Sequence, residues 1–600
     1  MAQEPAQLSR PVLIYDGDCA FCRYTVEYAR AVTGNAVEYR AYQQAAEDYP
    51  DICVGEFRAS IQLLEDGVRR QGAEAAFRTL AFGGRAGWLA WYRRVPGFAA
   101  LTEWLYTWVA RHREGCMRVS RMLIGPELRP AQHARTAGLM IRGIGACSLA
   151  AFVSLWWQVE ALYGPDGILP AGAFLEAVAA QTGAERYWHL PSLLWLTSGS
   201  LALNVLCGAG TLGALISITG RLPATAALVQ YACYLSLLHA GQVFLSYQWD
   251  TFLLECLILA AVLARAPTAG IWVARLMLLR FMVLSGFVKL AGGDPTWWGG
   301  SALALHFETQ PLPNAIAWYV HHLPAWLLTG ATYATLLIEI VVPALILGPV
   351  RLRVAAFWLF LGLEVLIFLT GNYNFFNVLT MVLCLCLLDD ARLPFTRRFG
   401  DPVAAARGSA SARLAAAVLI ALGLLQLVQQ VRLLPDFARP LLIPARSLAV
   451  ANPYGLFAVI TRRRDELVVE GTLDGETWRA YGFPFKPGDV QQRPRWATPH
   501  QPRLDWQMWF AALNGPERAD WIYGLVDALL RGNPAVLALL DDPFEGSAPE
   551  AVRITIFRYR FTTPAERAET GAWGVRDQRR QWLPPMKLRT PIIRHEPLEL

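Results

Sequence analysis

GIWVARLMLLRFMVLSGFVKL, residues 270–290, is the stretch that decides the fold. It is apolar over the length that a helix needs to cross a hydrocarbon core of about 30 Å, and only three basic side chains interrupt it. Similar apolar runs lie on both sides of it. The predicted spans are residues 143–160, 193–217, 224–246, 250–265, 270–290, 325–349, 354–371, 374–389 and 414–434. The sequence therefore predicts a polytopic α-helical membrane protein with about nine spans.

The charge distribution predicts a membrane block with a soluble domain at each end. Hydrophobic residues make up 54% of the 600 residues and charged residues only 17%. Between residues 143 and 390 there are 8 Lys/Arg and 12 Asp/Glu, whereas both ends have the charge density of soluble protein. This pattern excludes a wholly soluble multidomain enzyme, a fibrous protein and a disordered chain. We expect domain boundaries at 1–130, 136–435 and 440–600.

The short loops predict an orientation through the excess of Lys and Arg on the cytoplasmic side. Arginines gather before the first predicted span and before the last one, and they recur in alternate loops at Arg221, Arg265 and Arg351. The loops between these are acidic or uncharged. With nine spans, we expect the N-terminal domain in the cytoplasm and the C-terminal domain in the periplasm, with the block in the inner membrane of a bacterium.

The N-terminal domain opens with PVLIYDGDCAFCRYTVEYARAVTG, residues 11–34. Residues 12–15 have the pattern of a buried strand, and Cys-x-x-Cys follows at the start of an amphipathic helix. Two residues between the thiols let them meet within one helical turn, and the helix N-terminus stabilises a thiolate on the first of them. We predict that Cys19 is the attacking thiol and Cys22 the resolving thiol. A strand near 37–39, a hairpin at 59–64 and 68–69, and a helix at 73–80 complete a thioredoxin-like α/β domain.

The alternative for this pair is half of a zinc site, which we consider weaker because the chain has no second Cys-x-x-Cys. YDGDCAFC resembles the DCC-type thiol-disulfide oxidoreductase family over about residues 10–125. The resemblance implies that Asp18, Cys19 and Cys22 are the signature residues, and that Asp16 and Gly17 shape the turn before them. Thioredoxins place a proline opposite the cysteines, just before the third strand, whereas EFRASIQLL at 56–64 has none.

Ionisable residues inside apolar spans are costly and therefore informative. The predicted set is Glu255, Arg275, Arg280, Lys289, Glu339 and Glu364. They predict either a polar substrate or proton site within the membrane or internal ion pairs that fix helix packing, and we favour the ion pairs. His-x-Glu at 306–308 is a weak candidate for a metal ligand, and we expect no metal site.

After residue 440 the chain turns polar. Residues 456–460, 466–471, 477–481 and 552–561 read as strands, and 504–513, 520–530 and 534–540 as helices. The domain is thus α+β, rich in strand, and lacks G-x-S-x-G, H-E-x-x-H and a phosphate loop, so we expect no cofactor. Trp506, Trp509 and Phe510 predict either a client-binding groove or an aromatic core, and we favour the core.

Several strings in the membrane block and beyond it resemble the lipase maturation factor family over about residues 135–575. They are YGPDGILPA, YQWDTFLLE, LSGFVKLAGGDPTWW, LHFETQPLPNAIAWYVHHLP, LTGNYNFFNVLT, NPYGLF and PHQPRLDWQMWFAAL. The family's members are multi-span proteins of the eukaryotic endoplasmic reticulum membrane, with bacterial relatives. The resemblance implies a chaperone-type factor that helps homodimeric lipases fold. An N-terminal thiol domain is not usual in the family.

Three functions therefore remain open. The first is a membrane-bound folding factor for exported lipases or related hydrolases, with a client lipase and membrane lipid as partners. The second is an oxidoreductase that uses Cys19 and Cys22 on a thiol or disulfide partner. The third, and weakest, is an integral membrane carboxylase-type enzyme that uses Lys289 and the loop around His306. We expect the first two together. No basic stripe interleaved with aromatic residues suggests nucleic-acid binding.

Overall fold

The computed structural model describes residues 10–393 and 409–588. The chain forms two compact units: Met1–Gln132 with Gly348–Val354, here called the thiol unit, and the remainder, here called the membrane unit. Residues 397, 398 and 407, which belong to the predicted basic loop before the last span, lie outside the described residues.

The thiol unit is an α/β domain with one four-stranded sheet. Its strands are β1 (Val12–Tyr15), β2 (Glu38–Ala41), β3 (Gln62–Glu65) and β4 (Val68–Gln71), in the order β2-β1-β3-β4. Its helices are α1 (Ala20–Thr33), α2 (Tyr42–Ala45), α3 (Val54–Ala59), α4 (Gly72–Phe82), α5 (Gly87–Arg94), α6 (Phe98–Arg111) and α7 (Arg113–Leu123). The strand, hairpin and helix predicted before residue 80 are confirmed. The hairpin turns at Asp66 and Gly67, which both have positive φ, as the twist of a two-residue turn requires.

Alternation along β1 gives the sheet a core on each face. Leu13 points toward α1 and α4 and packs with Val26, Leu63 and Ala75. Ile14 points the other way and packs with residues of α2 and α3, including Phe57. Only β1 and β2 are parallel, so their carboxyl ends lie side by side at the same end of the sheet, where α1 begins. That end carries the cysteines.

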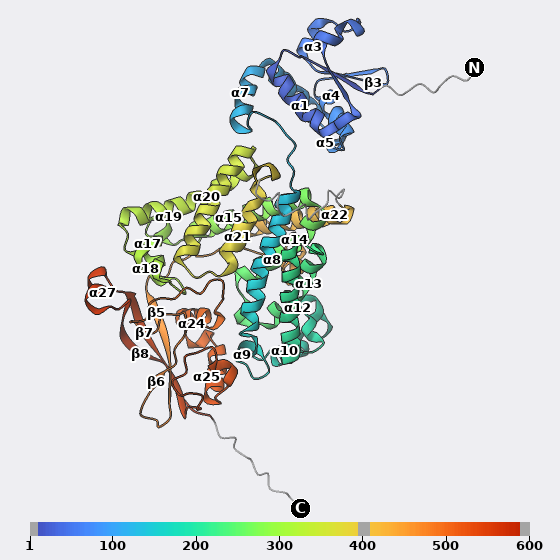
Figure 1. Ribbon diagram of the computed structural model, residues 1–600. Coiled ribbons are helices and arrows are strands. Elements are labelled where there is room, and N and C mark those ends of the chain that lie inside the picture. The colour runs from blue at the N-terminus through green and yellow to red at the C-terminus, as the bar shows by residue number, and fades with distance from the viewer. Residues whose placement is uncertain (1–9, 394–408, 589–600) are drawn as a thin grey trace, which may run out of the picture. The chain divides into compact units, whose positions relative to one another are not determined.

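The membrane unit is mostly helical. Its helices before residue 300 are α8 (Ala134–Trp156), α9 (Val159–Tyr163), α10 (Ala171–Thr182), α11 (Arg186–His189), α12 (Ser200–Thr219), α13 (Pro223–Ala240), α14 (Gln248–Arg265), α15 (Pro267–Ala291) and α16 (Pro295–Trp298). The bundle continues with α17 (Ala302–Thr309), α18 (Ala315–His321), α19 (Ala325–Ile340), α20 (Val350–Thr370), α21 (Phe375–Cys384) and α22 (Ala410–Gln430). The first residues of α20, up to Val354, belong to the thiol unit. α8 packs against α12, α14 and α21, and α15 packs against α14, α19 and α22 (Figure 1).

Six helices of the described residues are long and apolar enough to cross a membrane, so the predicted count of nine is not confirmed. They are Ala134–Trp156, Ser200–Thr219, Pro267–Ala291, Ala325–Leu347, Val350–Thr370 and Ala410–Gln430. The other three predicted spans are helices too, but α14 carries Asp250, Glu255 and Arg265 within 18 residues, and α21 has only 10 residues. α13 has 18 residues and includes Gln230 and His239. The protein is a multi-pass membrane protein, and the coarse prediction is confirmed.

The C-terminal domain belongs to the membrane unit and carries the second sheet. Its elements are α23 (Ile443–Ser447), β5 (Arg464–Thr472), β6 (Arg479–Ala480), α24 (Arg503–Asn514), α25 (Trp521–Leu530), α26 (Pro534–Leu537), β7 (Ala551–Phe561), α27 (Pro564–Thr570) and β8 (Gly574–Met586). The sheet is antiparallel, in the order β6-β5-β7-β8. The predicted strand at 456–460 is wrong, because this segment runs irregularly against the bundle, and Ile460 packs with Trp297.

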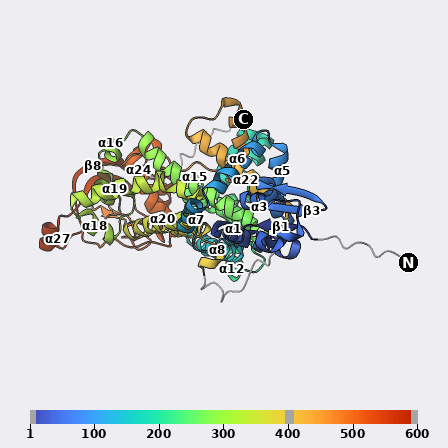
Figure 2. The ribbon, with the colours of Figure 1, turned by 90° about the horizontal axis from the view of Figure 1, so that it is seen from above.

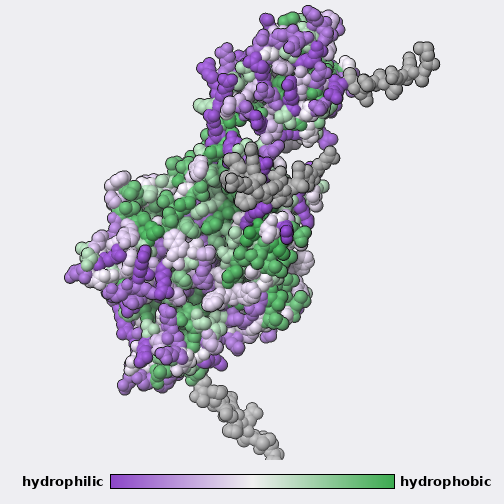
Figure 3. Space-filling view, viewed as in Figure 1, coloured by the Kyte–Doolittle hydropathy of each residue, from purple (hydrophilic) through white to green (hydrophobic). Residues whose placement is uncertain are grey.

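The surface of the membrane unit differs in hydropathy between the helix bundle and the C-terminal domain. Figure 3 shows apolar side chains over the helix bundle and hydrophilic ones over the C-terminal strands. The C-terminal domain lies at the end of the bundle where α8 leads into α9 (Figure 1). Seen from above, α18 lies beside α27 and β8 (Figure 2), and Arg567 in α27 donates a hydrogen bond to the hydroxyl of Tyr319 at 3.2 Å.

Candidate redox site and polar junction

The cysteine pair lies at the connection between β1 and α1. Cys19 is the N-cap of α1, and its Sγ accepts a hydrogen bond from the backbone N–H of Cys22 at 3.2 Å. Both thiols are free; Cys19 is partly exposed and Cys22 is buried. A partner can therefore reach Cys19 but not Cys22, which is the geometry that the roles of attacking and resolving thiol require.

The turn before the cysteines is held by a side chain that the sequence did not single out. Gln43 accepts a hydrogen bond from the backbone N–H of Gly17 at 3.0 Å and donates to Asp16 at 3.1 Å and to Asp18 at 3.0 Å. A Cβ on Gly17 would lie 2.8 Å from the Cβ of Ala41, so this position has no room for a side chain. The parallel pairing of β1 with β2 brings Gln43 here, since Tyr15 lies opposite Ala41.

Charged groups of α7 and of the turn face the buried cysteine. Arg113 lies 3.5 Å from the carboxylate of Asp16 and donates to the backbone carbonyls of Arg58 and Ala59 at 2.7 and 2.9 Å. Burial raises the pKa of the Cys22 thiol, the hydrogen bond and charge of Cys19 raise it further, and Arg113 opposes them. Cys22 therefore rests as a thiol, and Arg113, 97 residues from Asp16, is a site residue that only the fold reveals.

The segment before β3 contains no proline, and the backbone N–H of Ile61 in it is already hydrogen-bonded. The N–H of Ile61 donates to the hydroxyl of Tyr106 at 3.0 Å. This N–H is therefore not free to pair with the backbone of a bound polypeptide.

Four of the six predicted intramembrane residues form two ion pairs. Arg280 donates to Glu255, and Lys289 donates to Glu339 at 2.7 and 2.8 Å. Glu255 also accepts from the backbone and side-chain N–H groups of Asn452 at 2.6 and 2.8 Å. These four charges thus have the internal ion pairs that the sequence analysis favoured. Arg275 instead donates to the carbonyl of Cys386, and Glu364 accepts from the side chain of Asn377.

The aromatic residues of α24 face the loops of the helix bundle. Trp506 is 3% exposed and packs edge-on against Trp249, with ring centroids 4.8 Å apart. Trp509 donates from its indole N–H to the carbonyl of Thr309 at 3.1 Å, and Phe510 lies 6.0 Å from the ring of Tyr247. Trp509 and Phe510 remain half-exposed, whereas a client could not contact Trp506 in this structure.

Buried polar contacts, here called the polar junction, join the C-terminal domain to these loops. Arg503 is the central one: its guanidinium, 1% exposed, donates to Asp250 at 2.7 and 3.0 Å and to the carbonyl of Phe244 at 2.6 Å. The buried Arg464 donates to the carbonyls of Glu308 and Pro311 at 2.9 and 2.8 Å.

The junction continues on the other side of α24. Asn372 donates to the carbonyl of Arg495 at 3.0 Å and accepts from the N–H of Ala497 at 2.9 Å. His500 lies 3.0 Å from the hydroxyl of Ser154, and burial lowers its pKa to about 4, with Arg503 adding to the effect.

The strings that carry the family resemblance meet in this junction. Asp250 belongs to YQWDTFLLE, Asn372 to LTGNYNFFNVLT and Arg503 to PHQPRLDWQMWFAAL. The sequence showed them as separate motifs, and each places a polar residue within an apolar context. The apolar context was the available signal, but the partner of each residue lies 123 to 253 positions away and could not be predicted from it.

Lys289, a residue of the carboxylase-type alternative, is buried, and His306, its other residue, is partly buried. Lys289 is bonded to Glu339, and His306 lies 3.1 Å from the hydroxyl of Tyr373. Burial and, to a smaller extent, the charge of Lys289 lower the pKa of His306 to about 4. Across residues 10–393 and 409–588 there is no group of three or more His, Cys, Asp or Glu that could hold a metal ion.

The chain matches three described families. Residues 135–395 match the lipase maturation factor transmembrane domain, 450–584 the lipase maturation factor C-terminal domain, and 13–119 a DCC1-like thiol-disulfide oxidoreductase. Lipase maturation factor 2 of Homo sapiens is 34% identical over 591 residues, covering 76% of this chain and 83% of the relative. Lipase maturation factor 1 of Mus musculus is 30% identical over 502 residues, covering 75% and 87%. No solved structure matches.

Proposed function

Because this chain belongs to the lipase maturation factor family and carries a DCC1-like thiol-disulfide oxidoreductase domain in front of it, we propose that it is a membrane-bound folding factor for exported lipases or related hydrolases, with its own thiol chemistry. The observation that carries the proposal is the similarity to lipase maturation factors through both the membrane block and the C-terminal domain. The thiol part rests on Cys19 as the N-cap of α1 with Cys22 buried behind it.

The thiol step transfers two electrons. The Cys19 thiolate attacks one sulfur of a partner disulfide, forming a mixed disulfide and releasing the other partner sulfur as a thiolate. Cys22 then loses its proton and attacks Cys19 Sγ, which forms the Cys19–Cys22 disulfide and releases the second partner thiol. The partner disulfide is reduced and the pair is oxidised, and a dithiol partner regenerates the pair. Asp16, Gly17 and Asp18 shape the turn that presents Cys19.

We further propose that α13, α14 and α21 complete a bundle of nine spans, with the thiol unit in the cytoplasm and the C-terminal domain in the periplasm of a bacterial cell. The arginines of alternate loops support this orientation. Thiols are kept reduced in the cytoplasm, so the pair would act there on a cytoplasmic partner. A membrane-impermeant maleimide should leave Cys19 unmodified in intact cells whose outer membrane is permeabilised; modification of Cys19 under these conditions rules the orientation out.

The client contact is proposed on the surface of the C-terminal domain, with Trp509 and Phe510 as two aromatic side chains that retain partial exposure near the junction. Trp506 supports them from the interior. In cells that express the lipase, a photoreactive residue in place of Phe510 should crosslink to it, whereas the same residue in place of Tyr523, exposed on α25, serves as the matched position.

The deciding experiment measures exported lipase activity in a deletion strain that is complemented with the wild-type gene, with Cys19→Ser/Cys22→Ser, or with Cys53→Ser/Cys116→Ser. The last pair is the control, because it removes two thiols of the same domain outside the motif. If the wild type and the control restore lipase activity but Cys19→Ser/Cys22→Ser does not, thiol exchange is required for lipase maturation. Rescue by all three separates the folding role from the thiols. If deletion leaves lipase activity intact, the folding role is rejected and the membrane-anchored oxidoreductase remains.

A further inference from the structure

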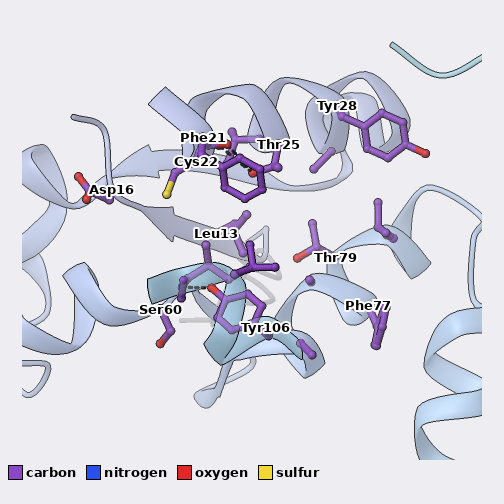
Figure 4. Close-up of a pocket in the computed structure, with 18 of the residues that line it drawn as sticks. Leu13, Asp16, Phe21, Cys22, Thr25, Tyr28, Ser60, Phe77, Thr79 and Tyr106 are labelled. Carbon is purple, nitrogen blue, oxygen red and sulfur yellow. Dashed lines mark hydrogen bonds between the residues drawn. The ribbon is translucent and has the colours of Figure 1, made fainter. Parts of the chain in front are cut away.

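The thiol unit contains an apolar groove along the side of α1 that carries Cys22 (Figure 4). Its volume is about 430 Å³, within the range of pockets that hold small molecules. α1, α4 and α6 form its walls. Cys22 and Asp16 lie toward one end, and Tyr28 and Phe77 toward the other.

The polar groups of the groove are already hydrogen-bonded within the protein. Thr25, Thr79 and Thr102 each donate to a carbonyl of their own helix, at 3.0, 2.7 and 2.9 Å. The hydroxyl of Tyr106 accepts from the N–H of Ile61. Asp16 and Arg113 also line the groove, at the end that carries Cys22, and lie 3.5 Å from each other. The rest of the groove offers apolar surface, so the ligand that suits it is a hydrocarbon chain.

The groove is continuous with an exposed aromatic face on α5 and α6. The face consists of the exposed side chains Trp88, Trp91, Leu101, Trp104, Leu105 and Trp108. Phe77, which lines the groove, stacks on Trp88 with ring centroids 6.2 Å apart, and Leu105 belongs to both surfaces. An exposed apolar patch of this kind marks an interaction site, and tryptophan is typical of the boundary between lipid and water.

The charges around this face fit an anionic surface. Arg93, Arg94 and Arg111 are exposed at the ends of α5 and α6. Glu103 is the only acidic residue of the two helices, and it points inward, accepting from the N–H groups of Ala73 and Glu74 at 3.1 and 3.0 Å. Tryptophan with arginine and without exposed carboxylates is the composition of helices that lie on anionic bilayers.

The chain itself keeps a bilayer within reach. Residues 124–133 join α7 to α8, the first membrane helix, and ten residues span at most about 35 Å when fully extended. This covalent connection limits the distance between α7 and α8 in every arrangement of the two units.

We propose that the thiol unit is a lipid-binding module: the aromatic face of α5 and α6 lies on an anionic bilayer, and the groove between α1, α4 and α6 takes up one unbranched acyl chain of a phospholipid. The acyl chain covers the side of α1 on which Cys22 lies and so links lipid occupancy to access to the resolving thiol. The inference goes beyond the proposed folding role and does not depend on it.

Photolabelling of the full chain tests the proposal. The protein is placed in nanodiscs of phosphatidylethanolamine and phosphatidylglycerol in which either the phosphatidylglycerol or added palmitate carries a diazirine on its acyl chain. Peptide mass spectrometry should find phospholipid label on α1, α4 and α6 as well as on the membrane helices. Label from palmitate alone would overturn the bilayer as the source, and label confined to the membrane unit would overturn the site.

A matched pair of variants on α1 separates the groove from the general surface. Ala29→Trp fills the groove, whereas Ala31→Trp adds the same side chain at an exposed position outside it. Filling should lower the label on the thiol unit about tenfold or more, and the control should leave it unchanged. Slow alkylation of Cys22 checks that each variant is folded. If Ala29→Trp does not fold, Leu105→Gln makes the α6 wall of the groove polar, and undiminished label in this variant contradicts the proposal.

Discussion

At the scale of single residues, the turn before the cysteines depends on a glycine for reasons of space. A Cβ at Gly17 would lie 2.8 Å from the Cβ of Ala41 and 2.9 Å from the side-chain oxygen of Gln43. Gly17→Ala should therefore destabilise the thiol unit by about 1–3 kcal/mol and speed alkylation of the buried Cys22. Peptide-resolved alkylation in urea measures this. Gly87→Ala on α5, whose Cβ would meet nothing within 4 Å, should have no such effect, and equal rates for the two variants would contradict the packing argument.

His500 gives the polar junction a defined response to acid. Its pKa is lowered to about 4 in the folded chain, below the usual value near 6.5, so between these values the unfolded chain takes up a proton that the folded chain does not. The contribution of neutral His500 is fully present above pH 6.5 and is lost as the pH falls toward 4, by about 3 kcal/mol in all.

The comparison of His500→Gln with wild type isolates this effect, because Asp505, whose pKa burial raises to about 6, titrates equally in both proteins. Unfolding in urea at pH 7 and pH 5, followed by tryptophan fluorescence, should show a smaller loss of stability on acidification in the variant. His189→Gln, at an exposed histidine, should behave as the wild type. Parallel pH curves for His500→Gln and wild type would show that the histidine is not coupled to folding.

Residue patterns on the sequence predicted the turn that carries Cys19 and Cys22 at the start of α1, but not the contacts of the polar junction. Cys19, Cys22 and the turn of Asp16 to Asp18 lie within seven positions, so local spacing predicted their arrangement. Gln43 and Arg113 join them only because β2 pairs with β1 and α7 packs beside α1, which no local pattern encodes.

At the scale of elements, α24 is the link between the C-terminal sheet and the helix bundle. Removing the guanidinium in Arg503→Met leaves Asp250 buried without its cation, which typically costs about 3–5 kcal/mol. Limited proteolysis of the full chain should then cut the C-terminal domain faster. Arg531→Met, which removes an exposed pair with Asp527, is the control and should cost less than about 1 kcal/mol.

A double variant decides whether charge pairing or overall packing is responsible. Arg503→Met/Asp250→Leu removes both charges, so the orphaned carboxylate disappears and much of the protease resistance should return. A double variant as sensitive as Arg503→Met would assign the loss to the bonds with Phe244 and Tyr234 instead.

The spacing of hydrophobic residues predicted most helices and strands, but it failed for segments whose conformation is set by tertiary contacts. α24, α25 and β7 lie close to their predicted positions, because each has a clear apolar face. β8 was not predicted, since residues 576–581 are exposed on both faces and show no alternation. Residues 456–460 have the apolar composition of a strand, but the segment is irregular and packs against the helix bundle.

At the scale of the whole molecule, the two units have separate cores. Deleting residues 1–132 should leave the membrane unit folded, with an unchanged thermal midpoint in detergent, because its core and the polar junction contain none of these residues. Fluorescence-detected gel filtration of the fragment measures this. Deleting residues 440–600 instead should cause aggregation, since it removes the partners of Asp250 and Asn372. Aggregation of the first fragment would mean that the thiol unit is part of the fold of the membrane unit.

The polar junction also sets an order of events during synthesis. Asp250, the carbonyl of Gln310 and Asn372 emerge from the ribosome long before Arg503, Arg464 and Ala497, which bond them. A nascent chain that has inserted all its helices thus still displays unsatisfied polar groups at the end of the bundle where α8 leads into α9, until Arg503 has been translated. During its synthesis this protein therefore passes through a stage in which it exposes an incomplete polar surface of the kind that quality control detects. Premature termination anywhere before the second sheet leaves the chain in that stage.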